Sequence, residues 1–226
     1  MSAGSRPPTF SHLDALRRSY DRGASERNEI HDLQWRTGVL EAWLLDLPPA
    51  PRLLELGPGT GQLARHAEGL GARVHAIDLS PENVSYCWQR GISAEVGDFR
   101  GLRHRNAQQL FDGVYAINAL LHVPRVEHAA VIAGALDCLL PGGSLLMVNW
   151  GGRDFEGIWA DDPCDPPRFF SHYDDATFFG LTFDGFDVVR REVLAAQAPD
   201  GLRPQLLIAR RAPAGVSSSQ ALPHGS

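Results

Sequence analysis

Glycines and carboxylates with the spacing of an adenosine-binding site occur in the first half of the chain. The string LLELGPGTG ends an apolar run in a turn that contains Gly57, Gly59 and Gly61, with Glu55 just before it. Glycine at these positions allows a sharp turn and close approach of a ligand, and the helix that follows offers free N–H groups to an anion. Asp78 ends the next apolar run, in AIDLSPENV, where a carboxylate can accept both hydroxyls of a ribose. The pattern therefore predicts a pocket for a ligand that carries adenosine.

Two further features separate the possible ligands. The turn has the spacing G-x-G-x-G, whereas the dinucleotide fingerprint G-x-G-x-x-G places its third glycine one residue later. Asp98 ends a third apolar run, in EVGDF, and Phe99 follows it, so that a carboxylate and an aromatic ring stand where adenine can be recognised. The match to a pyrophosphate site is therefore imperfect, and a nicotinamide-dependent oxidoreductase is the alternative rather than the first choice.

The composition limits the chemistry and the cellular setting. With 226 residues, 43% hydrophobic and 21% charged, the chain is expected to form one globular domain. All 21 basic residues are arginine, which excludes a Schiff-base lysine, a P-loop lysine and a Tyr/Lys dehydrogenase pair. The net charge of −6 opposes binding to nucleic acid. Three scattered cysteines, with neither a signal-peptide pattern nor an apolar stretch of about 18 residues, predict a cytoplasmic protein without disulfides, zinc or a membrane span.

The elements that must position these residues follow from the hydrophobic periodicity. A helical stripe covers residues 30–47 and ends at two prolines, after which apolar runs alternate with helical patterns. Helices are expected after the turn at Gly61, from Ser80-Pro81, and over about 125–140. Strand and helix repeated in this way predict an α/β fold, a parallel sheet with helices on both faces. The expected strands of the repeat are 52–57, 73–79, 93–98, 112–120 and 143–150.

The last third of the chain departs from this alternation. Residues 151–173 are rich in Gly, Asp, Pro and aromatic residues without a helical or strand period, so an ordered insertion near a binding site is expected. A helix from about residue 174 and strands over 187–193 and 204–210 follow, and the short turn between these strands requires them to be antiparallel. Residues 212–226 are small, polar and contain proline, which predicts a disordered tail.

Taken together, the motifs resemble those of the class I S-adenosylmethionine-dependent methyltransferases. LLELGPGTG is similar to the first motif of that family, DLS to its ribose acid, GDF to its adenine site, FDGVYAINALLHVP to its fourth strand and LLPGGSLLMV to its fifth. YDRGASERN, NALLHVPR, EGIWADD and PPRFFS further resemble a group of small bacterial methyltransferases. The resemblance covers nearly the whole chain and implies a Rossmann-like, doubly wound, seven-stranded sheet that is mostly parallel and ends in a C-terminal antiparallel β-hairpin.

The resemblance also implies roles and domain boundaries. The three glycines would line the methionine half of S-adenosylmethionine, Asp78 its ribose, and Asp98 with the Phe99 backbone its adenine, while Glu55 would act through a water. Asn118 would offer a backbone carbonyl to the ammonium of the cofactor. Residues 1–50 would form a helical cap over this site, and residues 51–211 the methyltransferase domain with its substrate-loop insertion. The side chains of the cap that are expected near the cofactor are Tyr20 and, with less weight, Arg27, Trp35 and Arg36.

Catalysis by such a protein requires mainly that the acceptor be positioned in line with the carbon–sulfur bond. A base is needed only when the nucleophile carries a proton, and His122, after the expected fourth strand, is the candidate. The alternative is that the His122 ring bonds a backbone carbonyl and orders the turn before Pro124. His172 is a second candidate base.

The insertion and the strand before it supply the expected substrate pocket. An apolar pocket with few polar anchors is the usual form of a small-molecule site. Asp161, Asp162 and Asp165 either give this pocket a negative rim for a cationic substrate or form an acidic surface loop, which is the commoner case. The residues expected to bind the substrate are Trp150, Trp159, Phe170, His172 and Tyr173.

The sequence thus predicts transfer of a methyl group from S-adenosylmethionine to an oxygen or nitrogen of a small organic molecule, without a metal ion. The two alternatives are the nicotinamide-dependent oxidoreductase and a non-catalytic module that binds S-adenosylmethionine. Nucleic acid as the methyl acceptor is disfavoured, because the balance of charge is acidic. Loops set substrate choice on a shared fold, so the sequence predicts no particular acceptor.

Overall fold

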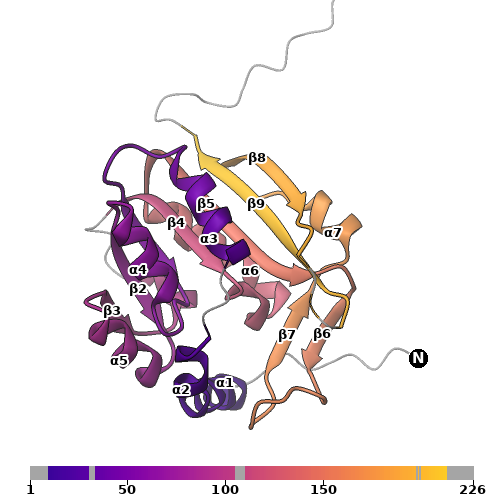
Figure 1. Ribbon diagram of the computed structural model, residues 1–226. Coiled ribbons are helices and arrows are strands. Elements are labelled where there is room, and N and C mark those ends of the chain that lie inside the picture. The colour runs from indigo at the N-terminus through magenta and orange to yellow at the C-terminus, as the bar shows by residue number, and fades with distance from the viewer. Residues whose placement is uncertain (1–9, 31–33, 105–109, 197, 199, 213–226) are drawn as a thin grey trace, which may run out of the picture.

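The computed structural model describes residues 10–30, 34–104, 110–196, 198 and 200–212 (Figure 1). Its centre is one seven-stranded sheet with the strand order β3-β2-β1-β4-β5-β9-β8. The first five strands in this order are parallel, whereas β9 pairs antiparallel with both β5 and β8. The predicted doubly wound sheet with a C-terminal antiparallel hairpin is therefore confirmed. The strands are β1 (Arg52–Leu56), β2 (Arg73–Asp78), β3 (Ser93–Val96), β4 (Phe111–Ile117), β5 (Leu139–Gly151), β6 (Phe155–Ile158), β7 (Phe169–His172), β8 (Phe186–Val193) and β9 (Arg203–Arg211).

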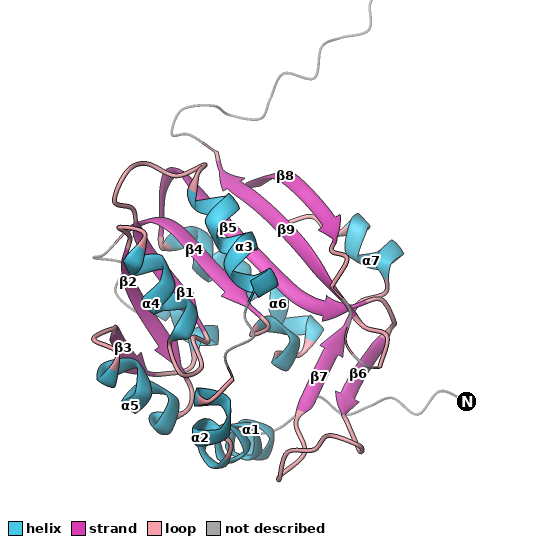
Figure 2. Cartoon of the chain, viewed as in Figure 1, coloured by secondary structure: helices cyan, strands magenta, loops and turns pink. Residues whose placement is uncertain are grey.

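Helices cover both faces of the sheet (Figures 1 and 2). In these views α3 and α4 lie in front of the strands and α6 behind them, while α1 and α2 lie at the lower edge, close to α5. The helices are α1 (Phe10–Arg22), α2 (Ala24–Asn28), α3 (Gln34–Leu44), α4 (Gln62–Gly69), α5 (Pro81–Gln89), α6 (Arg125–Asp137) and α7 (Asp175–Gly180), with short 3-10 helices η1 (Phe99–His104) and η2 (Leu120–His122).

Alternate residues of the central strands supply two separate hydrophobic cores. Leu53, Tyr115 and Leu146 belong to the core under α3, α4 and α5, whereas their neighbours Leu54 and Val114 belong to the core under α6 and α7. Successive side chains of a strand point to opposite faces, so a strand that is buried on both faces is apolar at nearly every position. This requirement explains the continuous apolar runs from which the strands were predicted.

Local signals in the sequence set the start of α5 as expected. The Ser80 side chain accepts a hydrogen bond from the Asn83 backbone N–H at 3.1 Å, and Pro81 occupies the first helical position. A cap of this kind satisfies one of the N–H groups that the first turn leaves without a partner. The helix therefore begins directly after the carboxyl end of β2, which places Asp78 at the base of its first turn.

Two helix boundaries differ from the sequence expectations, and a further expectation lies almost wholly outside the described residues. The helix expected over 30–47 is α3, Gln34–Leu44, and residues 31–33 lie outside the described part. Helix α6 ends at Asp137 rather than near Leu140, because Leu139 already pairs with Phe111 of β4. The tail predicted for residues 212–226 lies outside the described residues apart from its first residue.

The insertion at 151–173 contains two strands that its residue pattern did not indicate. β6 and β7 pair antiparallel, from Phe155 opposite His172 to Ile158 opposite Phe169, as a small separate sheet. A two-stranded sheet of four residues a strand is too short to show a reliable alternation of apolar and polar residues, and such a pair needs tertiary packing for stability. We call this pair and its connection, residues 155–172, the β6–β7 hairpin.

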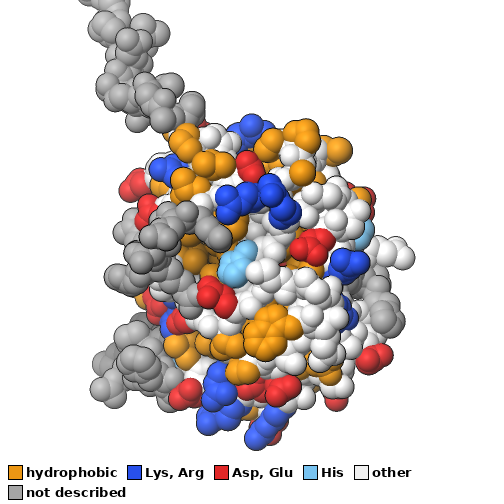
Figure 3. Space-filling model, turned by 90° about the vertical axis from the view of Figure 1, so that its left-hand side faces the viewer, with side chains coloured by type: hydrophobic (Ala, Val, Ile, Leu, Met, Phe, Trp, Pro, Cys, Tyr) orange, Lys and Arg blue, Asp and Glu red, His pale blue; other side chains and the backbone are white. Residues whose placement is uncertain are grey.

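The described residues also bear on the predictions about membrane spans and disulfides. None of the helices there is long and apolar enough to cross a membrane. The three cysteines are all free thiols. The face of the molecule seen in Figure 3, along the β3 edge of the sheet, carries basic, acidic and apolar side chains in a mixed arrangement.

Gly113 tests how tightly α3 packs on the sheet. A Cβ at this position would lie 2.5 Å from the Trp43 ring, and that ring is fixed by a 2.8 Å hydrogen bond from its Nε1 to Ser144 Oγ. We expect Gly113→Ala to lower the free energy of unfolding by about 1–3 kcal/mol, because the buried indole has no room to move. The measurement is urea unfolding followed by circular dichroism. Gly38→Ala is the matched control: nothing lies within 4 Å of its added Cβ in α3, so a gain of about 0.5–1 kcal/mol is expected.

Candidate functional site

A cavity of about 370 Å³ lies at the carboxyl ends of the central strands. The chain runs outward from β1 to β3 and then returns to β4 on the other side of β1, and a crevice opens where the strand order reverses in this way. Residues of α1, α2, η2 and the β6–β7 hairpin complete its wall. The predicted site residues that line the cavity are Tyr20, Glu55, Gly57, Gly59, Asp78, Asp98, Phe99, Asn118, His122, Trp150 and Phe170.

The turn requires glycine at positions 57, 59 and 61 because of its backbone conformation, and at two of them also because no space is left for a Cβ. Gly57, Gly59 and Gly61 all have positive φ, at 71°, 57° and 81°, a region that residues with a Cβ rarely adopt. A Cβ on Gly61 would also lie 2.9 Å from the sulfur of Cys87, and one on Gly57 would lie 2.7 Å from the Cβ of Ala119. Gly61 does not line the cavity itself, so its contribution is to let α4 start close against α5.

Asp78 is the acid around which the turn is built. Its Oδ2 accepts from the Gly59 N–H at 3.0 Å, and its Oδ1 accepts from the Ser80 N–H at 2.8 Å and from Asn83 Nδ2 at 3.2 Å. Burial raises the pKa of this carboxyl, while these hydrogen bonds oppose the rise. A carboxylate offers about four lone-pair sites and three are used within the chain, so one is left for a ligand in the cavity that Asp78 lines.

Glu55 is buried on β1, with 2% of its surface exposed. Its Oε2 accepts a hydrogen bond from the Tyr115 hydroxyl at 2.8 Å. Burial raises the pKa of Glu55 to about 8, the Tyr115 bond acts against this, and the nearby charge of Asp78 adds to it. A positive group in the cavity would favour the ionised form of this carboxyl.

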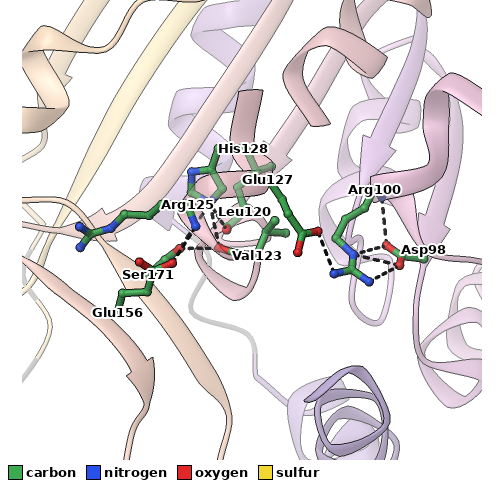
Figure 4. A network of polar contacts seen from close by, with 9 residues as sticks. All are labelled: Asp98, Arg100, Leu120, Val123, Arg125, Glu127, His128, Glu156 and Ser171. Carbon is green, nitrogen blue, oxygen red and sulfur yellow. Dashed lines mark hydrogen bonds and ion pairs between the residues drawn. The ribbon is translucent and has the colours of Figure 1, made fainter. Parts of the chain in front are cut away.

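Asp98 follows β3 and is held by Arg100. The Arg100 Nε donates to both carboxylate oxygens, at 3.0 and 2.9 Å, and its second terminal nitrogen donates to Oδ2 at 2.7 Å. Arg100 also reaches Glu127 of α6 at 3.0 Å (Figure 4). Both oxygens of Asp98 are thus engaged by Arg100, and Phe99 stands beside it in the wall.

Asn118, directly after β4, shows the strain that marks functional sites. It has a positive φ of 59°, its backbone N–H donates to Val148 O at 2.7 Å, and it lines the cavity. Its side-chain Nδ2 and Oδ1 are buried and have no hydrogen-bond partner among the described residues. An unsatisfied buried amide costs about 1–3 kcal/mol, so its retention here fits a group whose partner is a ligand.

His122 is bonded at both ring nitrogens. Nδ1 lies 2.8 Å from the carbonyl oxygen of Phe169 in β7, and Nε2 lies 2.5 Å from the hydroxyl of Tyr20 in α1. Burial, with the nearby Arg168 charge, lowers the pKa of His122 to about 3, so the ring is neutral at pH 7. The carbonyl bond expected as the alternative role of His122 is present, and its role as a base stays a prediction.

Two cavity residues that the sequence did not single out are Arg100 and Arg168. Arg168 lies just before β7, and its Nε and one terminal nitrogen bind the carboxylate of Asp162 at 2.9 and 2.8 Å. Asp162, with 2% of its side chain exposed, is thus tied to this arginine, and Asp165 is bonded to Arg22 of α1. A D-x-R spacing was a visible signal for Arg100 beside Asp98, whereas nothing local marked Arg168.

The remaining predicted substrate residues lie around the cavity rather than in its wall. Trp159 and His172 contact Phe170 with ring centroids 5.5 and 5.4 Å apart, so they support a residue that does line it. His172 Nδ1 lies 2.9 Å from Trp150 O. The Tyr173 hydroxyl is 3.0 Å from His128 Nδ1, beside a separate small cavity. Their roles toward a substrate stay predictions.

The network beneath the hairpin links it to α6 (Figure 4). The Arg125 guanidinium donates to the carbonyl oxygens of Phe155 and His172, and the Arg125 N–H donates to Glu156 at 2.8 Å. The Ser171 hydroxyl donates to Val123 O at 2.7 Å. These bonds hold both strands of the hairpin against the first turn of α6. Among the described residues, no group of three or more His, Cys, Asp or Glu side chains is placed to hold a metal ion.

Comparisons with known proteins find similarity to methyltransferases. Residues 53–143 match the family model of a methyltransferase domain. The ubiquinone biosynthesis O-methyltransferase of Xanthomonas oryzae is 38% identical over 108 residues, which are 46% of this chain and 44% of that protein. The chain therefore matches less than half the length of the curated relatives.

Solved structures share the fold over a longer span. The 1,6-didemethyltoxoflavin-N1-methyltransferase of Burkholderia thailandensis, solved with S-adenosylhomocysteine, has a TM-score of 0.72 and 18% identity, and the match covers 93% of each chain. The CcbJ methyltransferase of Streptomyces caelestis has a TM-score of 0.68 and 19% identity, with 86% of this chain and 98% of that chain covered. At this identity the likeness concerns the fold.

The raised pKa of Glu55 predicts how stability depends on pH without ligand. The unfolded carboxyl titrates near its ordinary 4.5 and the folded one near 8, so between these values the folded chain binds the extra proton. Stability is therefore lost as pH rises through this window, by about 2 kcal/mol between pH 6 and 8. Urea unfolding of the wild type and Glu55→Gln at pH 6, 7 and 8 measures this difference, since the variant lacks the titrating group. An equal loss in both proteins would assign the pH dependence to other residues.

Proposed function

We propose that this chain, whose residues 53–143 match a methyltransferase domain, is a class I S-adenosylmethionine-dependent methyltransferase that transfers the methyl group of this cofactor to an oxygen or nitrogen of a small organic molecule. The observation that carries the proposal is the convergence of the glycine turn, Asp78 and the unpartnered amide of Asn118 on one cavity at the strand switch point. When bound there, S-adenosylmethionine supplies a methyl group made electrophilic by its sulfonium.

The residues present fit the parts of this cofactor. Asp78 has a lone pair left for the ribose hydroxyls, and the turn at Gly57 and Gly59 gives backbone approach to the methionine half. Asn118, with its buried unpaired amide, would hold the ammonium region, and the protonated Glu55 would ionise beside that positive charge. Asp98 with Phe99 would hold the adenine and Tyr20 would close over the cofactor from α1.

The same proposal assigns a role to each of three segments of the chain. Residues 1–50 act as a cap, because α1 and α2 contribute to the cavity wall, and residues 51–211 form the methyltransferase domain. The β6–β7 hairpin, within the insertion at 151–173, forms the acceptor side with Trp150 and Phe170 as its apolar wall. The cytoplasmic location and the absence of nucleic acid among the partners stay predictions of the sequence.

Titration calorimetry tests the cofactor. We expect micromolar binding of S-adenosylmethionine and S-adenosylhomocysteine and none of NAD, NADH or their phosphorylated forms. Asp78→Ala should weaken binding at least tenfold, because a charged hydrogen bond contributes about 1.5–3 kcal/mol. Glu82→Ala is the matched control, since it removes an exposed carboxylate from the first turn of α5. A thermal melt of each variant verifies folding. Preference for a nicotinamide dinucleotide would overturn the proposal.

Turnover separates the enzyme from a non-catalytic binding module. Purified protein with radiolabelled S-adenosylmethionine should transfer label to members of a panel of small phenols, amines and acids. Cofactor binding of full strength without transfer to any of them would support the module instead.

A further inference from the structure

The two hydrogen bonds of the His122 ring determine which group is the donor in the hydrogen bond between His122 and Tyr20. The Phe169 carbonyl has no proton to give, so the 2.8 Å contact makes His122 Nδ1 the donor. In the neutral ring, Nε2 is then a bare acceptor, and the Tyr20 hydroxyl, 2.5 Å away, must donate its only proton to it. The Tyr20 oxygen therefore has no proton left to donate, and it can act toward a ligand only as an acceptor, beside the long 3.4 Å hydrogen bond that it already accepts from Arg168. Both residues line the cavity.

Two positively charged guanidinium groups lie close to the Tyr20 side chain. The Arg27 guanidinium lies 4.3 Å from the centroid of the Tyr20 ring, and that of Arg168 lies 5.6 Å from it. One terminal nitrogen of Arg168 is 3.4 Å from the Tyr20 hydroxyl oxygen. The other donor groups of Arg168 are committed to Asp162, and the bonds of Arg27 within the described residues go to Tyr20 O and Cys164 Sγ. The site thus combines a hydrogen-bond acceptor with two cations, of which Arg168 has all three of its side-chain nitrogens engaged within the chain.

We propose, building on the function proposed above, that the methyl acceptor is a neutral amine that donates an N–H to the Tyr20 oxygen, with Tyr20 as the catalytic residue and His122 as the residue that positions it. The amine lone pair forms the new N–C bond while the C–S bond breaks and its electrons return to sulfur. The proton remains on the methylated ammonium product and is lost to solvent afterwards, so the step needs no base.

The other acceptor classes fit this arrangement less well. A hydroxyl group must lose its proton during transfer, and the one unprotonated nitrogen of His122, Nε2, already accepts the Tyr20 proton and is a weak base, because burial lowers the pKa of His122 to about 3. A carboxylate has no proton to donate and would face the lone pairs of the Tyr20 oxygen. For an amine, Arg27 and Arg168 disfavour the ammonium form, which has no lone pair for attack. Trp150 and Phe170, in the same wall, favour an amine on an aromatic ring.

Matched probes test the acceptor class. We would measure binding to the protein alone, and methyl transfer from radiolabelled S-adenosylmethionine, for 3-aminoquinoline, 3-hydroxyquinoline and quinoline-3-carboxylate and for the corresponding naphthalene series. We expect the amine of each series to bind more tightly and to react at least tenfold faster than its partners. Amines that are no better than hydroxyl or carboxylate compounds in both readouts, including no response to any probe, would overturn the inference.

Substitutions test the assigned residues. Tyr20→Phe should abolish the preference for amines in binding and lower kcat for them at least tenfold. Tyr86→Phe is the matched control, because it removes a tyrosine hydroxyl from α5 at a position that does not line this cavity. His122→Gln keeps an oxygen that can accept from Tyr20, so it should retain at least a tenth of wild-type kcat while His122→Ala loses more. Equal loss in both His122 variants, with Tyr20→Phe unaffected, would restore His122 as the base.

The two proposals fail in different ways. A wild-type protein that binds neither S-adenosylmethionine nor S-adenosylhomocysteine refutes the proposed function. Firm binding of both, with a hydroxyl or carboxylate compound as the preferred acceptor, leaves that function in place and refutes only the assignment of an amine.

Discussion

Burial of the parallel strands on both faces is the constraint on which the rest of the molecule depends. Because Leu53 and Leu54, or Val114 and Tyr115, face different cores, the strand interiors have no room for groups that need water. Polar residues that interact with a ligand are consequently confined to the carboxyl ends, where the chain leaves the sheet. The reversal of strand order between β1 and β4 then leaves a crevice at that edge, and the cavity occupies it.

The cavity holds polar groups under conditions that cost stability. Glu55 is a buried carboxyl whose raised pKa keeps it protonated, and Asn118 combines a left-handed backbone with an amide that has no partner in the described chain. A protein selected for stability alone would replace both. Their presence beside Asp78 is consistent with a site in which charge and hydrogen bonding are completed by a ligand.

Long-range contacts assemble the acceptor side. Tyr20 of the cap meets His122 of η2, and His122 meets Phe169 of the β6–β7 hairpin, so three segments far apart in sequence share one line of hydrogen bonds. Arg168 and Asp162 stiffen the same region, and Arg125 fastens the hairpin to α6. The carbonyl oxygen of Phe169 can only accept, so His122 Nδ1 must donate to it, and Tyr20 must then donate to His122 Nε2. One backbone carbonyl thus determines whether the Tyr20 hydroxyl acts as a donor or an acceptor.

The sequence by itself determined the sheet, the glycine turn and the strand-end acids, because each depends on local periodicity or on the backbone freedom of glycine. The start of α5 at Ser80 and the antiparallel terminal pair were predictable for the same reason. The β6–β7 hairpin, whose strands are too short to show a period, and the partners of Arg168 and His122 were revealed by the folded structure alone. The partners of His122 come from packing between distant segments. Arg168 pairs with Asp162 within the hairpin, so this acid belongs to an ion pair, a role that neither alternative from the sequence had named. The residue types determine which polar groups the chain has. The fold determines which of these groups are already hydrogen-bonded within the chain and which remain for a ligand.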